Sequence, residues 1–354
     1  MAKKPNSWQK VGIQAKFRRF LVFVGVILLI LFILNTFLHV FTIGQFFKKP
    51  LSKDVSSEMQ GANWNGKTKL VIVFDTNPLT VAVFDPKNKR VDAIIIDRET
   101  RSDMPYSYGW NRLGAVRDLG NLDNGTKGNS LLVDTMAKFL QTPVDGFVIV
   151  HDDAWQSLDA QKITDGVRSF SSVKTFPKII SSKDWQSRFE TNLTKFDVLR
   201  LWWGLRGVRS DKVIITDLSR EGLLTDILLP DGSHGFGPEE VSIAAFSKKV
   251  FFDDLISQEK LNIEVLNGTD TPGIASNVAR LVENVGGNVV RVANSEVENK
   301  DLCAIRASKA NTSKYTTLRL AKALRCDIEE VQTGGDESQA DLTILVGRDL
   351  IGRF

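Results

Sequence analysis

The sequence predicts an α/β protein with an N-terminal transmembrane helix, a mixed-sheet α/β domain and a small α/β domain at the C-terminus. Three observations predict this class. Residues 20–47 contain no Asp, Glu, Lys or Arg; β-branched runs and amphipathic stretches then alternate; and a strand–helix–strand pattern follows residue 260. With 354 residues, 42% of them hydrophobic, the chain can bury two cores of ordinary size.

A basic tail, residues 1–19, precedes the predicted anchor at residues 20–47. A bilayer core needs about 20 residues of apolar helix. Six Lys or Arg come before the segment and three follow it closely, which places the N-terminus inside. The alternative, a cleaved signal peptide, would have an apolar region of about 7–15 residues ending at small residues. We therefore predict a single-pass protein of the plasma membrane with its C-terminal domains extracytoplasmic and its bilayer contact through residues 20–47.

The basic isoelectric point, near 8.9, originates in the first 49 residues, which carry eight Lys or Arg and no acidic residue. Removing those eight from the 46 basic residues leaves 38 against 42 acidic residues, so the remainder has a net charge of −4. A slightly acidic ectodomain has no electrostatic reason to bind phosphate backbones. We predict no nucleic-acid partner, and a cytoplasmic tail of nineteen residues argues against a transcriptional regulator.

A linker at residues 48–66 leads into a first domain at residues 67–245. Turn sequences rich in Asp, Asn and Pro separate its opening strands. The expected strands are Leu70–Phe74, Leu79–Phe84, Val91–Ile96, Val144–Val150, Asp211–Thr216 and Leu223–Leu229. The expected helices are Ser130–Leu140, Ser182–Phe189 and Lys195–Leu205. The Gly- and Pro-containing segments Pro230–Ser233 and Gly235–Pro238 are predicted to mark the close of this domain.

A second linker is predicted at residues 246–260 and a second domain at residues 261–354. Its expected elements are strand Asn262–Leu266, helix Gly273–Asn284, strand Asn288–Val292, helix Thr316–Leu324 and strand Leu342–Val346. Cys303 and Cys326 both fall in this domain, outside the reducing cytoplasm on the predicted topology. The sequence is compatible with a disulfide and with two buried thiols.

Four segments of the second domain resemble the LytR C-terminal domain. They are Ile263–Thr269 (IEVLNGT), Pro272–Ala275 (PGIA), Gly286–Val290 (GGNVV) and Leu345–Asp349 (LVGRD). That domain commonly follows the LytR-CpsA-Psr module of bacterial envelope proteins. The resemblance covers about ninety residues.

The first domain is similar, more distantly, to the LytR-CpsA-Psr module itself. The matching segments, in order, are Phe84–Lys89 (FDPKNK), Asp97–Thr100 (DRET), Asn111, Val133–Leu140 (VDTMAKFL) and Pro143–Val150 (PVDGFVIV). The resemblance implies binding of cell-wall glycopolymer or peptidoglycan. In active members it implies a phosphotransferase that moves a glycopolymer from polyprenyl pyrophosphate to peptidoglycan, with Mg²⁺ as cofactor.

The resemblance implies Arg98, Glu99 and Asn111 as catalytic candidates. Arg98, Arg101 and Arg112 are candidates for binding the pyrophosphate or polymer, and Asp75 and Glu99 for binding the metal. This chain departs from the family pattern, because Glu99 replaces an Asp, Trp110 replaces a Lys and the later arginine-rich stretch is missing. We therefore expect a degenerate, non-catalytic module that binds cell-wall polymer or its polyprenyl-linked precursor, with the active phosphotransferase as the alternative.

Two further groups of residues have a functional and a structural interpretation. His151, Asp152 and Asp153 follow a buried strand and could bind a metal, but a polar turn that caps a helix is favoured. Trp202 and Trp203 could stack on sugars, but a position in the core is favoured.

Overall fold

The computed structural model describes residues 47–52, 64–122, 128–175, 178, 187–296, 301–331 and 340–354. The predicted anchor lies outside these ranges apart from its last residue, Phe47. Within the described ranges no helix is both long enough and apolar enough to cross a bilayer. Pro50–Phe354 forms one compact unit, distinct from Met1–Lys49.

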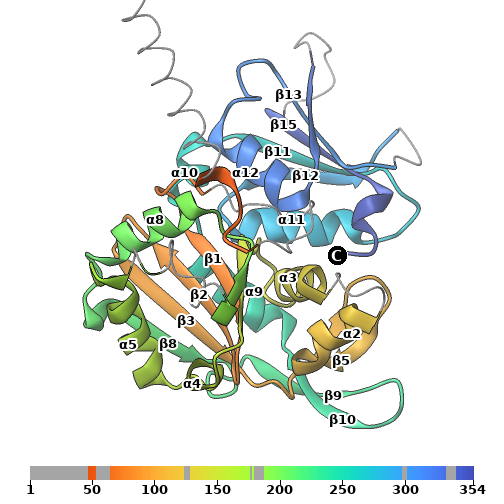
Figure 1. Ribbon diagram of the computed structural model, residues 1–354. Coiled ribbons are helices and arrows are strands. Elements are labelled where there is room, and N and C mark those ends of the chain that lie inside the picture. Colours follow the sequence, from red (N-terminus) through yellow and green to blue (C-terminus); the bar gives the residue numbers. More distant parts are fainter. Residues whose placement is uncertain are drawn as a thin grey trace, which may run out of the picture. The chain divides into compact units, whose positions relative to one another are not determined.

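A six-stranded mixed sheet forms the centre of the first lobe, defined as residues 64–259 (Figure 1), with strand order β7-β6-β1-β2-β3-β8. The three predicted opening strands are confirmed as antiparallel neighbours: β1 (Leu70–Asp75), β2 (Leu79–Asp85) and β3 (Arg90–Ile96). Strand β6 (Gly146–Val150) lies parallel to β1, and β8 (Val213–Asp217) lies parallel to β3. Strand β7 (Phe189–Thr191) pairs with β6 and forms one edge of the sheet.

Helices pack on both faces of this sheet (Figure 1). Successive side chains of a strand point to opposite faces. Val71 and Val73 of β1 therefore pack with α3 and α9, whereas Leu70 and Ile72 pack with α8. The helices of the lobe are α2 (Val116–Leu122), α3 (Gly128–Phe139), α4 (Asp153–Gln156), α5 (Ala160–Phe170), α8 (Lys195–Leu205), α9 (Glu240–Phe251) and α10 (Asp254–Glu259).

Helix α8 confirms a sequence prediction and has a well-defined start. Thr194 and Asp197 form a capping box, in which each side chain accepts a hydrogen bond from the other residue's backbone N–H. Near its end, Gly204 lies against the ring of Phe84, where a Cβ atom would come within 2.7 Å of ring carbons. A glycine at this position therefore lets α8 approach β2 closely.

Two hairpins extend the first lobe: β4 (Arg101–Met104) with β5 (Gly109–Arg112), and β9 (Leu224–Leu228) with β10 (His234–Pro238). Gly235–Pro238, expected to mark the close of the domain, instead pairs with β9 as part of β10. Pro238 stands at the strand end, where its missing N–H is tolerated. Residues 246–260, expected as a linker, lie largely in α9 and α10.

The second lobe, residues 262–354, is built on a five-stranded mixed sheet of order β12-β11-β15-β13-β14. Its strands are β11 (Asn262–Asn267), β12 (Asn288–Asn294), β13 (Ala304–Ala307), β14 (Asp327–Glu330) and β15 (Leu342–Val346). Its helices are α11 (Ile274–Asn284) and α12 (Tyr315–Leu324), both as predicted to within a residue. Cys303 and Cys326 form a disulfide with their Cα atoms 4.7 Å apart, which decides between the two states that the sequence left open.

Buried ion pairs join the two lobes. Asp134 on α3 accepts hydrogen bonds from Arg325 (3.1 Å), from Arg353 (3.2 Å) and from the hydroxyl of Tyr106 (2.6 Å). A second pair joins Arg319 of α12 to Asp145, before β6. Isolated buried charges are unstable in a protein interior, so these contacts hold the lobes in a fixed register.

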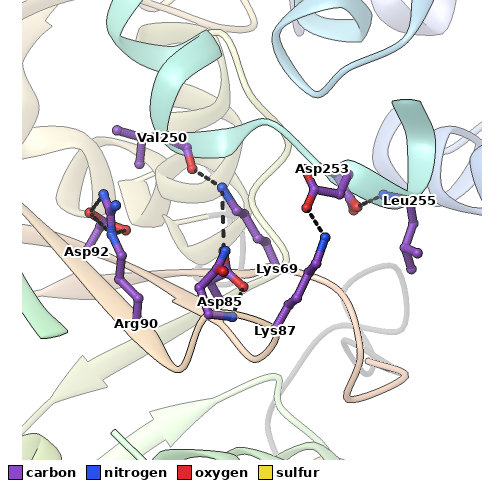
Figure 2. A network of polar contacts seen from close by, with 10 residues as sticks. Lys69, Asp85, Lys87, Arg90, Asp92, Val250, Asp253 and Leu255 are labelled. Atoms are coloured by element: carbon purple, nitrogen blue, oxygen red, sulfur yellow. Dashed lines mark hydrogen bonds and ion pairs between the residues drawn. The ribbon is translucent and has the colours of Figure 1, made fainter. Parts of the chain in front are cut away.

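A polar network fastens the start of β1 to the segment that leads into the second lobe (Figure 2). The ammonium of Lys69 donates to the carbonyl of Val250 (2.7 Å) and lies 4.0 Å from the carboxylate of Asp85. Asp253 caps α10 by accepting from the N–H of Leu255 (2.9 Å). Burial lowers the pKa of Lys69, with the neighbouring Asp85 acting in the opposite direction.

Candidate functional site

A cavity of about 480 Å³ lies between the first sheet and the helices α5 and α8. Its walls are mostly apolar. Those from the sheet include Ile72, Phe74, Ala82, Phe84, Ala93 and Val148, and those from the helices include Ile163, Val167, Phe170, Leu201 and Leu205. The volume is within the range of small-molecule sites. An apolar lining of this kind suits a hydrocarbon chain better than a sugar, which would leave its hydroxyl groups without partners.

Charged side chains supply the polar part of the lining. They are Asp152, Lys162, Lys178 and Arg188. Arg188 donates to Asp152 (3.0 Å), and Lys162 donates to the carbonyl of Ser157 (2.8 Å). Three cations and one carboxylate leave this lining with a positive charge, which favours an anionic head group on an apolar ligand.

Two arginines converge on the carboxylate of Asp75, at the end of β1. Arg98, which follows β3, donates to one oxygen (2.7 Å), and Arg117 of α2 donates to the other (3.0 Å). Arg98 also donates to the carbonyls of Thr76 (3.0 Å) and Gly114 (2.7 Å). The side chains of both arginines are 29% exposed. The cluster therefore carries one net positive charge and remains within reach of solvent.

A short loop links this arginine cluster to the cavity. Thr76 gives its carbonyl to Arg98, and the next residue, Asn77, exchanges backbone hydrogen bonds with Gln156 (2.6 Å) and Leu158 (3.1 Å). Leu158 lines the cavity. The loop after β1 therefore contacts the arginine cluster through Thr76 and the cavity wall through Asn77.

The structure unites only part of the site that the sequence suggested. Arg98 and Asp75 meet, but Glu99 pairs with Arg112 (3.1 Å) in an exposed position. Exposed pairs of this kind contribute at most about 1 kcal/mol. Asn111 donates back to the carbonyl of Tyr108 (2.9 Å).

Two arginines differ from the sequence prediction. Arg101 was predicted to bind the ligand, but its side chain packs beside Gly235 of β10. Arg117 was not predicted, but it joins the cluster at Asp75. Arg117 was missed, because its partner Asp75 lies 42 residues away and no spacing rule connects an early strand end to a later helix. A basic residue on the first helix after Asn111 is the one signal that could have pointed to it.

The residues do not fit a Mg²⁺ site. Magnesium takes oxygen ligands in near-octahedral geometry and is usually held by one or two carboxylates. Both oxygens of Asp75 already accept from guanidinium groups, and Glu99 pairs with Arg112. Nowhere in the described ranges do three Asp, Glu, His or Cys side chains gather in an arrangement that could hold a metal ion.

Two alternatives from the sequence are decided by contacts. The capping interpretation of the segment after β6 is confirmed, since Asp152 accepts from the N–H of Ala154 (3.0 Å) at the start of α4. Trp202 is buried, as predicted, but the prediction of a core position is wrong for Trp203, whose surface is 67% exposed. The two residues are adjacent on α8, so they point in different directions.

Comparison with known proteins identifies the second lobe. Residues 260–350 match the family described as LytR cell envelope-related transcriptional attenuator. The second lobe is a LytR C-terminal domain. This confirms the resemblance of its four sequence segments and relates the chain to cell-envelope proteins. No curated protein matches the chain.

Several solved structures are similar to part of this chain. Bacillus subtilis TagV is 19% identical over 52% of this chain and 96% of its own, with a TM-score of 0.39. B. subtilis TagT is 15% identical over 57% of this chain and 97% of its own, with a TM-score of 0.35. TagT bound to LIIa-WTA is 12% identical over 57% of this chain and 94% of its own, with a TM-score of 0.35.

Proposed function

We propose that this chain is a membrane-anchored, extracytoplasmic envelope protein whose first lobe is a degenerate LytR-CpsA-Psr module. It binds a lipid-linked precursor of a cell-wall polymer. The apolar cavity carries this proposal, because a polyprenyl chain is an apolar ligand that needs such a chamber. Lys162, Lys178 and Arg188 give the lining a positive charge, which suits the charged head of the same ligand.

The proposal of a non-catalytic module rests on how the arginine cluster is bonded. Transfer from a pyrophosphate needs charge stabilisation of the departing group, which depends on free cations or a metal. Three hydrogen bonds hold the guanidinium of Arg98 to Asp75, Thr76 and Gly114. Asp75 neutralises one of the two arginine charges, and no carboxylate in the cluster remains free for Mg²⁺. The site is therefore suited to hold an anion weakly and not to activate it.

A binding experiment tests the cavity. Full-length protein in detergent is titrated with polyprenyl-pyrophosphate glycan. Ala82→Phe, which fills the cavity with a ring, should weaken binding roughly tenfold or more, equivalent to about 1.4 kcal/mol. The matched control is Ala154→Phe, the same change at an exposed site on α4 outside the cavity lining. Equal affinities for the two variants would remove the cavity from the proposal.

Active phosphotransferase is the second candidate, favoured by the second arginine that the structure adds to the cluster. The assay supplies the same glycan, a peptidoglycan acceptor and Mg²⁺. We expect no transfer above the background of a reaction without protein. Metal-dependent transfer that disappears in both Arg98→Ala and Arg117→Ala would overturn the non-catalytic proposal and leave the binding proposal intact.

A further inference from the structure

The first residues of the unit Pro50–Phe354 lie beside the start of α8. The N–H of Leu51 donates to the carbonyl of Leu193 (2.9 Å), and the hydroxyl of Ser52 accepts from the N–H of Thr191 (2.9 Å). Pro50 pairs with Thr194, the residue that caps α8. Pro50 is the third residue after the uncharged segment ends at residue 47, and three residues span at most about 10 Å. The start of α8 is therefore tied by only a few residues to the end of the uncharged segment.

The outward face of α8 combines aromatic rings with arginines. Trp203 is exposed, and the guanidinium of Arg206 lies 5.5 Å from its ring centroid and 5.1 Å from that of Trp202. Arg200 lies 5.5 Å from the ring centroid of Phe196. Trp203 is nine residues from the cap, roughly 13 Å along the helix axis. Tryptophan and arginine on one helix face are typical of the interface between water and lipid.

The charge of this segment is opposite in sign to that of the rest of the ectodomain. Residues 194–212 contain five basic residues: Lys195, Arg200, Arg206, Arg209 and Lys212. Of the two acidic residues, Asp197 is buried in the capping box, and Asp211 pairs with Arg209 (3.0 Å). The outward face is therefore basic on a lobe that is otherwise slightly acidic, and a basic face is attracted to anionic lipid head groups.

We propose that the outward face of α8, made of Phe196, Arg200, Trp203 and Arg206, rests on the anionic lipid surface of the membrane that anchors the chain. This inference rests on the proposed anchor. The inward face of the same helix lines the cavity with Leu201 and Leu205. Leu51, which follows the anchor, lines it as well. If one side of α8 contacts lipid and the other side lines the cavity, the cavity lies beside the bilayer. A polyprenyl chain would then enter the cavity directly from the membrane.

Quenching of native tryptophan by brominated lipid tests this contact. The full chain is reconstituted into vesicles of anionic phospholipid brominated near the head-group end of the acyl chains. Trp203→Phe should remove a quenchable component contributed by one of the seven tryptophans. Trp110→Phe, at a half-exposed residue on β5, is the matched control and should leave the quenched fraction unchanged. The double variant R200E/R206E should reduce the quenching of Trp203, as should vesicles of zwitterionic lipid.

The outcomes separate this inference from the proposed anchor. Vesicles are washed at alkaline pH and floated. A chain that stays with the vesicles but shows the same quenching in Trp203→Phe, Trp110→Phe and wild type overturns the lipid contact and leaves the anchor in place. A chain that does not float overturns both. Loss of quenching in Trp203→Phe alone establishes the contact.

Discussion

The carboxylate of Asp134 offers a direct test of how the two lobes are joined. Its side chain is 1% exposed and accepts hydrogen bonds from Arg325, Arg353 and Tyr106. Removing one partner of a buried ion pair typically costs about 3–5 kcal/mol. Arg353 keeps hydrogen bonds to the carbonyls of Leu324 (2.7 Å) and Ala323 (3.4 Å). We therefore expect Asp134→Ala to lower the free energy of unfolding by about 3 kcal/mol, the lower end of the range.

The assay is thermal unfolding of the full chain in detergent, followed by tryptophan fluorescence. A loss of about 3 kcal/mol corresponds to a fall in Tm of roughly 5 °C for a cooperative unit of about 300 residues, whose unfolding entropy is about 2.1 cal/mol/K per residue. Glu99→Ala is the control, because it breaks the exposed pair with Arg112 and should cost less than about 1 kcal/mol. Equal shifts for the two variants would refute the view that a buried charge cluster fixes the register of the lobes.

Three further predictions concern stability. Gly204→Ala should destabilise the chain by about 1–3 kcal/mol, because its methyl group would overlap the Phe84 ring and displace α8. The same melting assay checks this. The control is Gly222→Ala, at a glycine with positive φ and no near neighbours, which should cost about 1 kcal/mol through backbone strain. Burial, together with Asp134 and Asp253 respectively, raises the pKa of Tyr106 and Tyr315. Because the unfolded chain ionises these phenols near pH 10 while the folded chain holds them neutral, stability should be full below about pH 10 and fall above it. Y106F/Y315F should show a shallower alkaline loss in denaturant titrations, and an unchanged slope would contradict this. Replacing both Cys303 and Cys326 by Ser opens a loop of 23 residues and should cost about 3 kcal/mol, whereas a stability equal to that of wild type would mean that the crosslink constrains nothing in the unfolded chain.

Local patterns in the sequence were sufficient for most elements of both sheets. The opening strands follow from β-branched runs between Asp- and Pro-containing turns, and α8 and α11 follow from helical spacing of apolar residues. The predictions were wrong where a segment pairs with another strand although its own composition is typical of a turn or a helix. Gly235–Pro238 has the composition of a turn, yet it pairs with β9 as β10. Glycine fits position 237 because a Cβ atom there would come within 2.6 Å of Ile227. Phe189, expected at the end of a helix, instead begins β7 beside β6.

The site was harder to predict, because its parts are distant in the chain. A family resemblance pointed to Arg98 and suggested Asp75, yet it grouped with them Glu99 and Arg112, which form a separate exposed pair. Arg117 and the cavity had no local signal. A charge pattern can show that a residue is basic, but it cannot show which carboxylate the residue will meet.

The sequence by itself determined most strands of both sheets, the basic N-terminal tail and the uncharged segment after it, and its four motifs identified the LytR C-terminal domain. The strands, the tail and the uncharged segment are encoded by neighbouring residues through periodicity, turn chemistry or charge, and the domain by its resemblance to a known family. Only the tertiary structure decided that two arginines share Asp75, that an apolar chamber lies under α8 and that Trp203 faces outward while Trp202 is buried. These features depend on which surfaces meet when the layers pack, and packing is a property of residues far apart in the chain.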